Sequence, residues 1–231
     1  MPKAEKPVLP PPPRGARPRA LKAVERLQQE YPAATELDHQ NAWQLVVATI
    51  LSAQTTDRTV NLVTPKLFAR YPTPADLAAA DPADVEVILK PTGFFRAKTR
   101  SVIRCAQDLV ERFHGEVPQR MEDLVTLQGI GRKTANVILS VGFGLPGFAV
   151  DTHVNRLANR LGLVSTTDPA KIEKQVTRMI PRREWGGFSL RLILHGRRIC
   201  VARRPKCEQC LMNDFCPSST VRPRSKSKRL F

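Results

Sequence analysis

The chain has 231 residues, of which 42% are apolar and 25% charged, so it can form one or two globular domains and is not wholly disordered. Its 37 lysines and arginines exceed its 21 acidic residues, and the net charge of +16 indicates a polyanionic partner, either nucleic acid or an anionic membrane. No apolar run approaches the length of a transmembrane helix, and the N-terminus leads into a proline run rather than a secretory signal.

Basic tails are predicted at both ends of the chain. The first twenty residues contain seven prolines and carry a net charge of +4, while residues 217–231 contain five cations and no acid. Such segments cannot bury apolar surface, so we predict that residues 1–17 and 218–231 are disordered. They act either as solubilising flanks or as weak, non-specific contacts to phosphate.

Helical patterns fill the chain between the tails. An apolar face recurs over residues 20–27, and residues 43–51 are apolar nearly all round, which is typical of a buried central helix. Thr73, Asp81 and Asp168 each place a capping side chain directly before a proline, which predicts helix starts. Further helical segments are predicted at residues 95–113, 133–141, 152–161, 170–180 and 184–199. No alternating strand pattern occurs, so we predict an all-α protein of about ten helices.

The stretch LVTLQGIGRKTA, residues 124–135, carries the clearest functional signal. A short apolar helix leads into Gly129, Ile130 and Gly131, and a second helix follows. The glycines allow a tight turn and a close approach to another surface, and the unpaired first amides of a helix attract anions. This pattern predicts a helix-hairpin-helix element that binds DNA phosphate without reading the bases, with an ordinary helix–helix corner as the alternative.

Two side chains near this turn are candidates for catalysis. Lys133 lies in the first turn of the second helix, where the helix N-terminus and Arg132 are expected to lower its pKa and free a nucleophilic amine. The alternative is a surface lysine bound to phosphate. Asp151, within VDTHV at residues 150–154, is either only a helix cap or a carboxylate that moves a proton and stabilises positive charge on a sugar.

A cysteine cluster lies near the C-terminus. Its members are Cys200, Cys207, Cys210 and Cys216. Four thiolates this close indicate a metal centre, and structural zinc and an iron–sulfur cluster both fit the spacing C-x6-C-x2-C-x5-C. The first interval contains three cations suited to phosphate: Arg203, Arg204 and Lys206. The fifth cysteine, Cys105, is predicted to be a buried core thiol.

Together these residues resemble the endonuclease III family, the helix-hairpin-helix DNA glycosylases of base excision repair. The matching segments are LSAQTTD at residues 51–57, LQGIGRKTAN at 127–136, VDTHV at 150–154 and the cysteine cluster. The resemblance covers about residues 20–217, and four motifs in this order are highly specific.

The resemblance implies a two-domain, all-α fold. A six-helix domain would span residues 36–146, and an iron–sulfur domain with a [4Fe-4S] cluster would combine residues 18–35 with 147–217. DNA would bind in the cleft between them. The implied partner is double-stranded DNA containing damaged bases or abasic sites, with no membrane association and with the chain as a monomer. We expect a cytoplasmic protein at a bacterial nucleoid, with the nucleus or an organelle as alternatives.

The resemblance also implies an activity, that of a bifunctional glycosylase and abasic-site lyase acting on oxidised pyrimidines. Lys133 would be the nucleophile and Asp151 its catalytic partner, while Gln54 fills the space left by the flipped base and Phe94 wedges into the opposite strand. Further implied DNA contacts are Gly129, Ile130, Gly131, Arg132, His153, Arg203, Arg204 and Lys206. The alternatives are a monofunctional mismatch glycosylase of the same fold and a weakly active or non-catalytic DNA-binding relative.

Two positions depart from the family pattern. Gln128 stands where the family usually has proline, which we expect to loosen the start of the hairpin. Phe94 stands where a smaller aliphatic residue is expected and is followed by a second aromatic residue, Phe95. A bulkier wedge is expected to change the preference for the opposite base.

Overall fold

The computed structural model describes residues 11–221, so most of the first predicted tail and of the second lie outside it. The described residues form eleven α-helices and no strand, which confirms the predicted all-α class. No helix among them is long and apolar enough to cross a membrane. The contacts divide the chain into two units: the hairpin unit, Ala34–Ala149, and the cysteine unit, residues 11–33 and 150–221.

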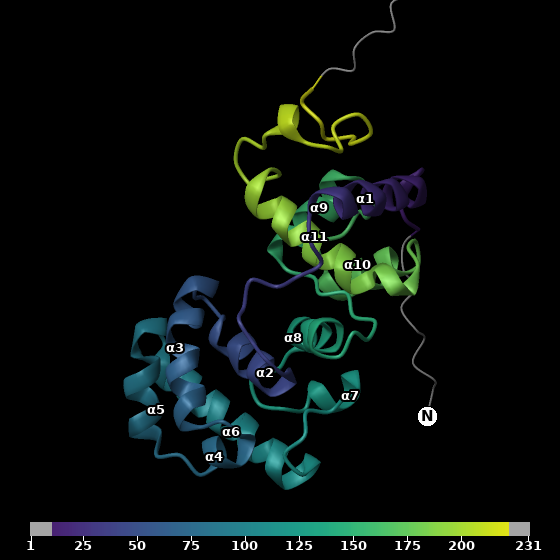
Figure 1. Cartoon of the computed structure of the whole chain (residues 1–231). Helices are drawn as coiled ribbons and strands as arrows, with labels where there is room; N and C mark the ends of the chain where they lie inside the picture. Colours follow the sequence, from purple (N-terminus) through teal and green to yellow (C-terminus); the bar gives the residue numbers. More distant parts are fainter. Residues whose placement is uncertain (1–10, 222–231) are drawn as a thin grey trace, which may run out of the picture. The chain divides into compact units, whose positions relative to one another are not determined.

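The hairpin unit is built around one apolar helix. Its α-helices are α2 (Ala42–Leu51), α3 (Asp57–Arg70), α4 (Pro74–Ala78), α5 (Pro82–Leu89), α6 (Phe95–Phe113), α7 (Met121–Leu124) and α8 (Arg132–Val137). A 3-10 turn, η1 (Lys90–Thr92), precedes α6, and a π-helical turn, η2 (Ile138–Gly142), continues α8. Seven of the ten residues of α2 are buried, and α2 packs against α3, α6 and α8 (Figure 1). The predicted central helix is therefore confirmed.

Local sequence signals set the starts of these helices. The Asn41 side chain accepts a hydrogen bond from the backbone amide of Gln44 at the start of α2, at 2.9 Å. Thr73 and Asp76 form a reciprocal capping box around α4, and the Asp81 side chain caps α5. Each cap satisfies backbone amides that a helix start leaves unpaired, so the capping residues predicted from the sequence begin helices as expected.

Helix α6 spans the residues predicted for it and presents a buried face to the rest of the hairpin unit. Cys105 on this face is fully buried, and burial raises the pKa of its thiol to about 12. A protonated, buried thiol behaves as a small apolar side chain, which confirms the predicted core role of Cys105.

The cysteine unit packs four helices under an irregular C-terminal segment. They are α1 (Ala16–Glu30), α9 (Thr152–Arg160), α10 (Pro169–Thr177) and α11 (Trp185–Arg198). Helix α11 packs against both α1 and α9, and α10 packs against α9 (Figure 1). Phe188, Leu27 and Leu157 are among the largest fully buried side chains of this unit. Short 3-10 turns occur at η3 (Arg182–Glu184) and η4 (Cys207–Gln209).

One boundary and one number of helices differ from those expected from the sequence. Helix α1 begins at Ala16, inside the predicted tail of residues 1–17, because Ala16 is buried in the cysteine unit. The hairpin unit contains seven α-helical segments rather than six, since α4 and α7 are short helices of five and four residues. The limits of the two predicted domains otherwise stay a prediction.

Helix α3 offers a matched test of the hairpin-unit core. Leu67 is fully buried and Leu62 is 66% exposed on the same helix. Leu67→Ala should lower the free energy of unfolding by about 2–5 kcal/mol, because it removes buried methyl groups and leaves a cavity. Leu62→Ala should change it by less than about 0.5 kcal/mol. Chemical denaturation measures both, and equal losses would show that α3 is not packed as described.

Candidate functional site

Apolar side chains anchor the turn between α7 and α8 on its buried side. Leu127 and Ile130 are 2% and 4% exposed, and the Ile130 amide donates to the Leu127 carbonyl at 3.1 Å. Gly129 has a φ of 82°, a left-handed conformation that favours glycine. A Cβ atom added to Gly131 would meet nothing within 4 Å, so the backbone at the start of α8 faces open space. The turn is therefore anchored on one side and open to a ligand on the other.

Gln128, which the sequence led us to expect would loosen this turn, makes a backbone hydrogen bond to α6. Its backbone amide donates a hydrogen bond to Oδ2 of Asp108 on α6, at 3.2 Å. Asp108 is 6% exposed and is also paired with Arg104, with an N–O distance of 3.2 Å. Proline has no amide hydrogen and could not make this bond. Gln128 thus ties the start of the hairpin to α6.

The hairpin unit also carries the other residues predicted to reach into DNA. Lys133 lies exposed in the first turn of α8, next to Arg132. Gln54 is exposed in the turn after α2, and Phe94 is 69% exposed directly before α6. Both have left-handed φ values, 53° and 48°, which are uncommon for residues other than glycine. Such conformations persist where the surrounding structure holds them, often at functional sites.

Asp151 caps α9 in the cysteine unit. Its Oδ1 accepts a hydrogen bond from the Val154 amide at 2.7 Å, which confirms the predicted capping geometry and fixes the orientation of the carboxylate. Nearby, the Arg156 guanidinium lies 3.0 Å from Nδ1 of His153, and burial lowers the pKa of His153. Asp151 and Lys133 belong to different units.

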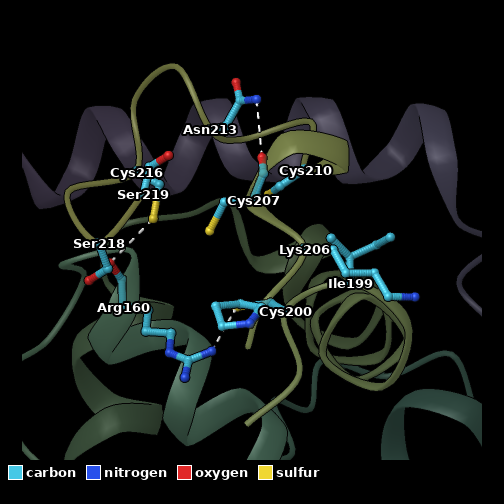
Figure 2. Close-up of a pocket in the computed structure, with 11 residues that line it drawn as sticks. Arg160, Ile199, Cys200, Lys206, Cys207, Cys210, Asn213, Cys216, Ser218 and Ser219 are labelled. Atoms are coloured by element: carbon cyan, nitrogen blue, oxygen red, sulfur yellow. Dashed lines mark hydrogen bonds between the residues drawn. The ribbon is translucent and has the colours of Figure 1, made fainter. Parts of the chain in front are cut away.

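The four predicted metal ligands line one cavity in the C-terminal segment. Figure 2 shows Cys200, Cys207, Cys210 and Cys216 around this space. The Met212 amide donates to the sulfur of Cys210 at 3.4 Å, and Arg160 donates to the sulfur of Cys200 at 3.4 Å. Hydrogen bonds of this kind stabilise metal-bound thiolates. The cavity therefore has the donor set of a four-thiolate centre.

Four thiols that share one cavity match the donor set of structural zinc and that of an iron–sulfur cluster. Tetrahedral zinc needs all its ligands at about 2.0–2.3 Å from one point. Burial raises the pKa of Cys210 to about 11, so a cationic group must compensate its thiolate.

Two residues that support this centre, His195 and Arg160, were not found by sequence reasoning. His195 on α11 is fully buried, burial lowers its pKa to about 4, and its Nε2 lies 3.3 Å from the sulfur of Cys210. The Tyr31 hydroxyl lies 3.2 Å from Nδ1 of the same ring. Arg160 donates to the Val201 and Ala202 carbonyls at 2.8 and 2.9 Å. The sequence offers no signal for either role, because the partners are 15 to 164 residues away.

These bonds from Arg160 support the loop between Cys200 and Cys207. The Lys206 amide closes the loop by donating to the Ile199 carbonyl at 3.0 Å. The three predicted phosphate-binding side chains of the loop are all exposed: Arg203, Arg204 and Lys206. The loop therefore presents positive charge to solvent from a braced backbone.

Two known protein families match the chain. The family of HhH-GPD superfamily base excision DNA repair proteins matches residues 47–182, and the iron–sulfur binding domain of endonuclease III matches residues 200–216. The second match covers all four cysteines of the cavity. The cofactor is a [4Fe-4S] cluster, which confirms one of the two interpretations of the cysteine spacing.

Individual relatives extend this similarity over most of the chain. Endonuclease III from Synechocystis sp. is 50% identical over 203 residues, which cover 87% of this chain and 93% of the relative. A non-covalent endonuclease III–DNA complex is similar with a TM-score of 0.82 and 37% identity, over 88% of this chain and 96% of that chain. A trapped endonuclease III–DNA covalent intermediate, an estranged-adenine complex, matches over the same shares with a TM-score of 0.82 and 38% identity.

These similarities confirm the resemblance identified from the motifs. The chain belongs to the endonuclease III family of helix-hairpin-helix base excision repair enzymes, which are DNA glycosylases and abasic-site lyases.

Proposed function

We propose that the protein excises oxidised pyrimidines from double-stranded DNA and nicks the strand through a Schiff base on Lys133. The observation that carries this proposal is the position of Lys133, an exposed amine in the first turn of α8 beside the open turn that ends at Gly131. The turn amides and Arg132 would bind the phosphates of the damaged strand. A positioned amine next to bound phosphates meets the need of a reaction at a sugar carbon.

The proposed chemistry assigns one role to each catalytic residue. The Nζ of Lys133 attacks C1′ of the damaged nucleotide, the bond from C1′ to the base breaks, and the base leaves with a proton. The sugar ring opens to give an imine with Lys133, and loss of a proton from C2′ then expels the 3′ phosphate by β-elimination. Water hydrolyses the imine and frees the lysine. Asp151 stabilises positive charge on the sugar and assists proton transfer.

Gln54 and Phe94 are proposed to keep the target nucleotide out of the helix. Both side chains are exposed, and both stand on backbone held in a left-handed conformation. Gln54 fills the space of the extruded base and Phe94 stacks into the opposite strand. We assign His153 and the cations of the loop, Arg203, Arg204 and Lys206, to contacts with DNA.

The cluster is proposed to act as a structural cross-link of residues 200–216. When bound, it supplies four metal–thiolate bonds to a segment with almost no regular secondary structure. Cys200, Cys207, Cys210 and Cys216 would hold it, and His195 and Arg160 would orient two of these sulfurs. The braced loop would then contact phosphate. The net charge of +16 favours a location on the bacterial nucleoid.

The nucleophile is tested by trapping the imine. Enzyme mixed with an abasic-site duplex and borohydride should give a crosslinked species on a denaturing gel, because borohydride reduces an imine to a stable amine. Lys133→Gln should lose the crosslink, base excision and nicking together, yet keep DNA binding. Lys66→Gln, the same charge change on the exposed surface of α3, is the control and should crosslink like wild type. Crosslinking by Lys133→Gln at the wild-type level would place the nucleophile elsewhere.

The same assay separates this proposal from a monofunctional glycosylase, which would excise bases without ever crosslinking.

Asp151→Asn tests the catalytic carboxylate. The variant should keep the fold, since asparagine also caps a helix. It should slow excision by about 10²–10⁴-fold, the usual contribution of a positioned acid–base group. Single-turnover excision measures this rate, and an unchanged rate would leave Asp151 with only its capping role.

Gln54→Ala tests the gap-filling role. It should slow excision of an oxidised pyrimidine on the order of tenfold, because a contact that supports an unstacked base is lost. Lyase action on a preformed abasic site should hardly change, since no base remains to be extruded. Gln40→Ala, an exposed glutamine before α2, should leave both rates unchanged. Equal losses on both substrates would mean that Gln54 only supports the fold.

Cys207→Ser tests the cluster. The variant should lose most of its bound iron and its visible absorption, because metal binding and local folding form one equilibrium. Its affinity for undamaged DNA should fall and depend less steeply on salt, since the braced cationic loop is lost. Cys105→Ala, which removes the thiol outside the cavity, should keep the iron. A colourless wild-type protein with stoichiometric zinc would contradict the assignment.

A further inference from the structure

Lys98 is a buried lysine in the first turn of α6 that the proposed chemistry does not use. It is only 5% exposed, although lysine is among the residues least often buried. Its Nζ donates a hydrogen bond to the Thr92 carbonyl at 2.9 Å and another to the hydroxyl of Thr55. The Thr55 hydroxyl in turn donates to the same Thr92 carbonyl at 2.5 Å. Two groups from separate segments thus meet at one ammonium.

The segments joined in this way are the two that carry Gln54 and Phe94. Thr55 follows Gln54 directly in the turn between α2 and α3, and Thr92 ends η1, two residues before Phe94. The two turns do not belong to one helix, and Thr55 and Thr92 are 37 residues apart in the sequence. The hydrogen bonds of Lys98 therefore connect the two backbone turns that carry Gln54 and Phe94. These two exposed side chains are proposed to enter DNA together.

The conformation of both turns requires such support. Gln54 and Phe94 have φ values of 53° and 48° and are not glycine, so their backbones relax unless they are held. Hydrogen bonds from a charged donor are among the stronger ones, especially where water is excluded. Burial also lowers the pKa of Lys98, and both acceptors are uncharged oxygens. Burying an ammonium without a carboxylate partner lowers the free energy of unfolding. Its presence here therefore points to a functional reason.

We propose that Lys98 is a positioning residue that locks the Gln54 turn to the Phe94 turn, so that the two side chains enter the duplex as one unit. The proposal rests on the roles proposed above for Gln54 and Phe94. Lys98 itself touches no DNA, because its ammonium is enclosed by the two turns. Its loss should leave the reaction at C1′ intact and impair only the extrusion of the base.

Lys98→Met is the primary test, because methionine keeps the length of the side chain and removes the donor. Amide hydrogen exchange reports the lock directly through the Ala53, Thr55 and Gly93 amides, which donate within their turns to Ile50, Ser52 and Lys90 carbonyls. In the variant these amides should exchange at least about tenfold faster, because loss of a hydrogen bond from a charged donor implies a factor of this size. The Ile130 amide of the hairpin should keep its wild-type rate.

The kinetic readout separates positioning from chemistry. Lys98→Met should slow single-turnover excision of an oxidised pyrimidine by about tenfold, while lyase action on a preformed abasic site changes less than about twofold. Lys98→Arg keeps a charged donor and should recover part of both readouts. Lys90→Met removes an exposed lysine from η1 and should affect neither, which controls for lost charge beside the Phe94 turn. If Lys98→Met does not fold, Thr55→Val carries the same expectations.

A double-mutant cycle decides whether Lys98 acts through the two side chains. Added to the Gln54→Ala, Phe94→Ala double variant, Lys98→Met should cause no further loss of excision. A further tenfold loss there, or wild-type exchange of the turn amides in Lys98→Met, would overturn the inference while the proposed function stands. If Gln54→Ala and Phe94→Ala leave excision unchanged, the proposed roles of these residues fail, and the inference fails with them.

Discussion

Burial of α2 is the constraint on which both functional turns of the hairpin unit depend. A helix that is apolar nearly all round cannot remain in water, so α3, α6 and α8 must enclose it. Each fully buried leucine or isoleucine contributes about 1.5–3 kcal/mol to this enclosure. The C-terminal end of α2 leads into the Gln54 turn, and Ile50 lies 3.5 Å from the position of a Cβ atom on Gly129. One buried helix thus sets the place of the Gln54 turn and of the hairpin turn.

Polar side chains hold the parts that apolar packing cannot reach. At the hairpin start Asp108 binds the Gln128 amide, and Lys98 donates to Thr55 and Thr92 in the Gln54 and Phe94 turns. In the cysteine unit, Arg160 at the end of α9 binds the backbone of the cationic loop, while Asp151 caps the beginning of the same helix. In each case a buried or half-buried polar side chain makes hydrogen bonds to a segment that lacks the regular backbone hydrogen bonds of a helix.

Local features of the sequence predicted the helices well. Helix α6 covers the predicted residues 95–113, and the capping residues before Pro74, Pro82 and Pro169 start α4, α5 and α10. These signals act within one or two turns, so no knowledge of distant residues is needed. The start of α1 was misplaced because the burial of Ala16 depends on the rest of the cysteine unit. The hydrogen bond of the Gln128 amide could not be predicted, because its partner, Asp108, lies 20 residues away.

The sequence by itself determined the helical class and the family, and it supplied the candidate nucleophile and the candidate metal ligands, because these depend on periodicity, short motifs and spacing. The cysteine spacing alone left zinc and an iron–sulfur cluster both possible, since spacing along the chain does not say how four thiols are arranged in space, and it was the family resemblance that implied a [4Fe-4S] cluster. Only the tertiary structure placed His195 against Cys210 and brought Lys98 between Thr55 and Thr92. Such contacts join residues far apart in the chain, and they form only when packing of apolar helices brings those residues together.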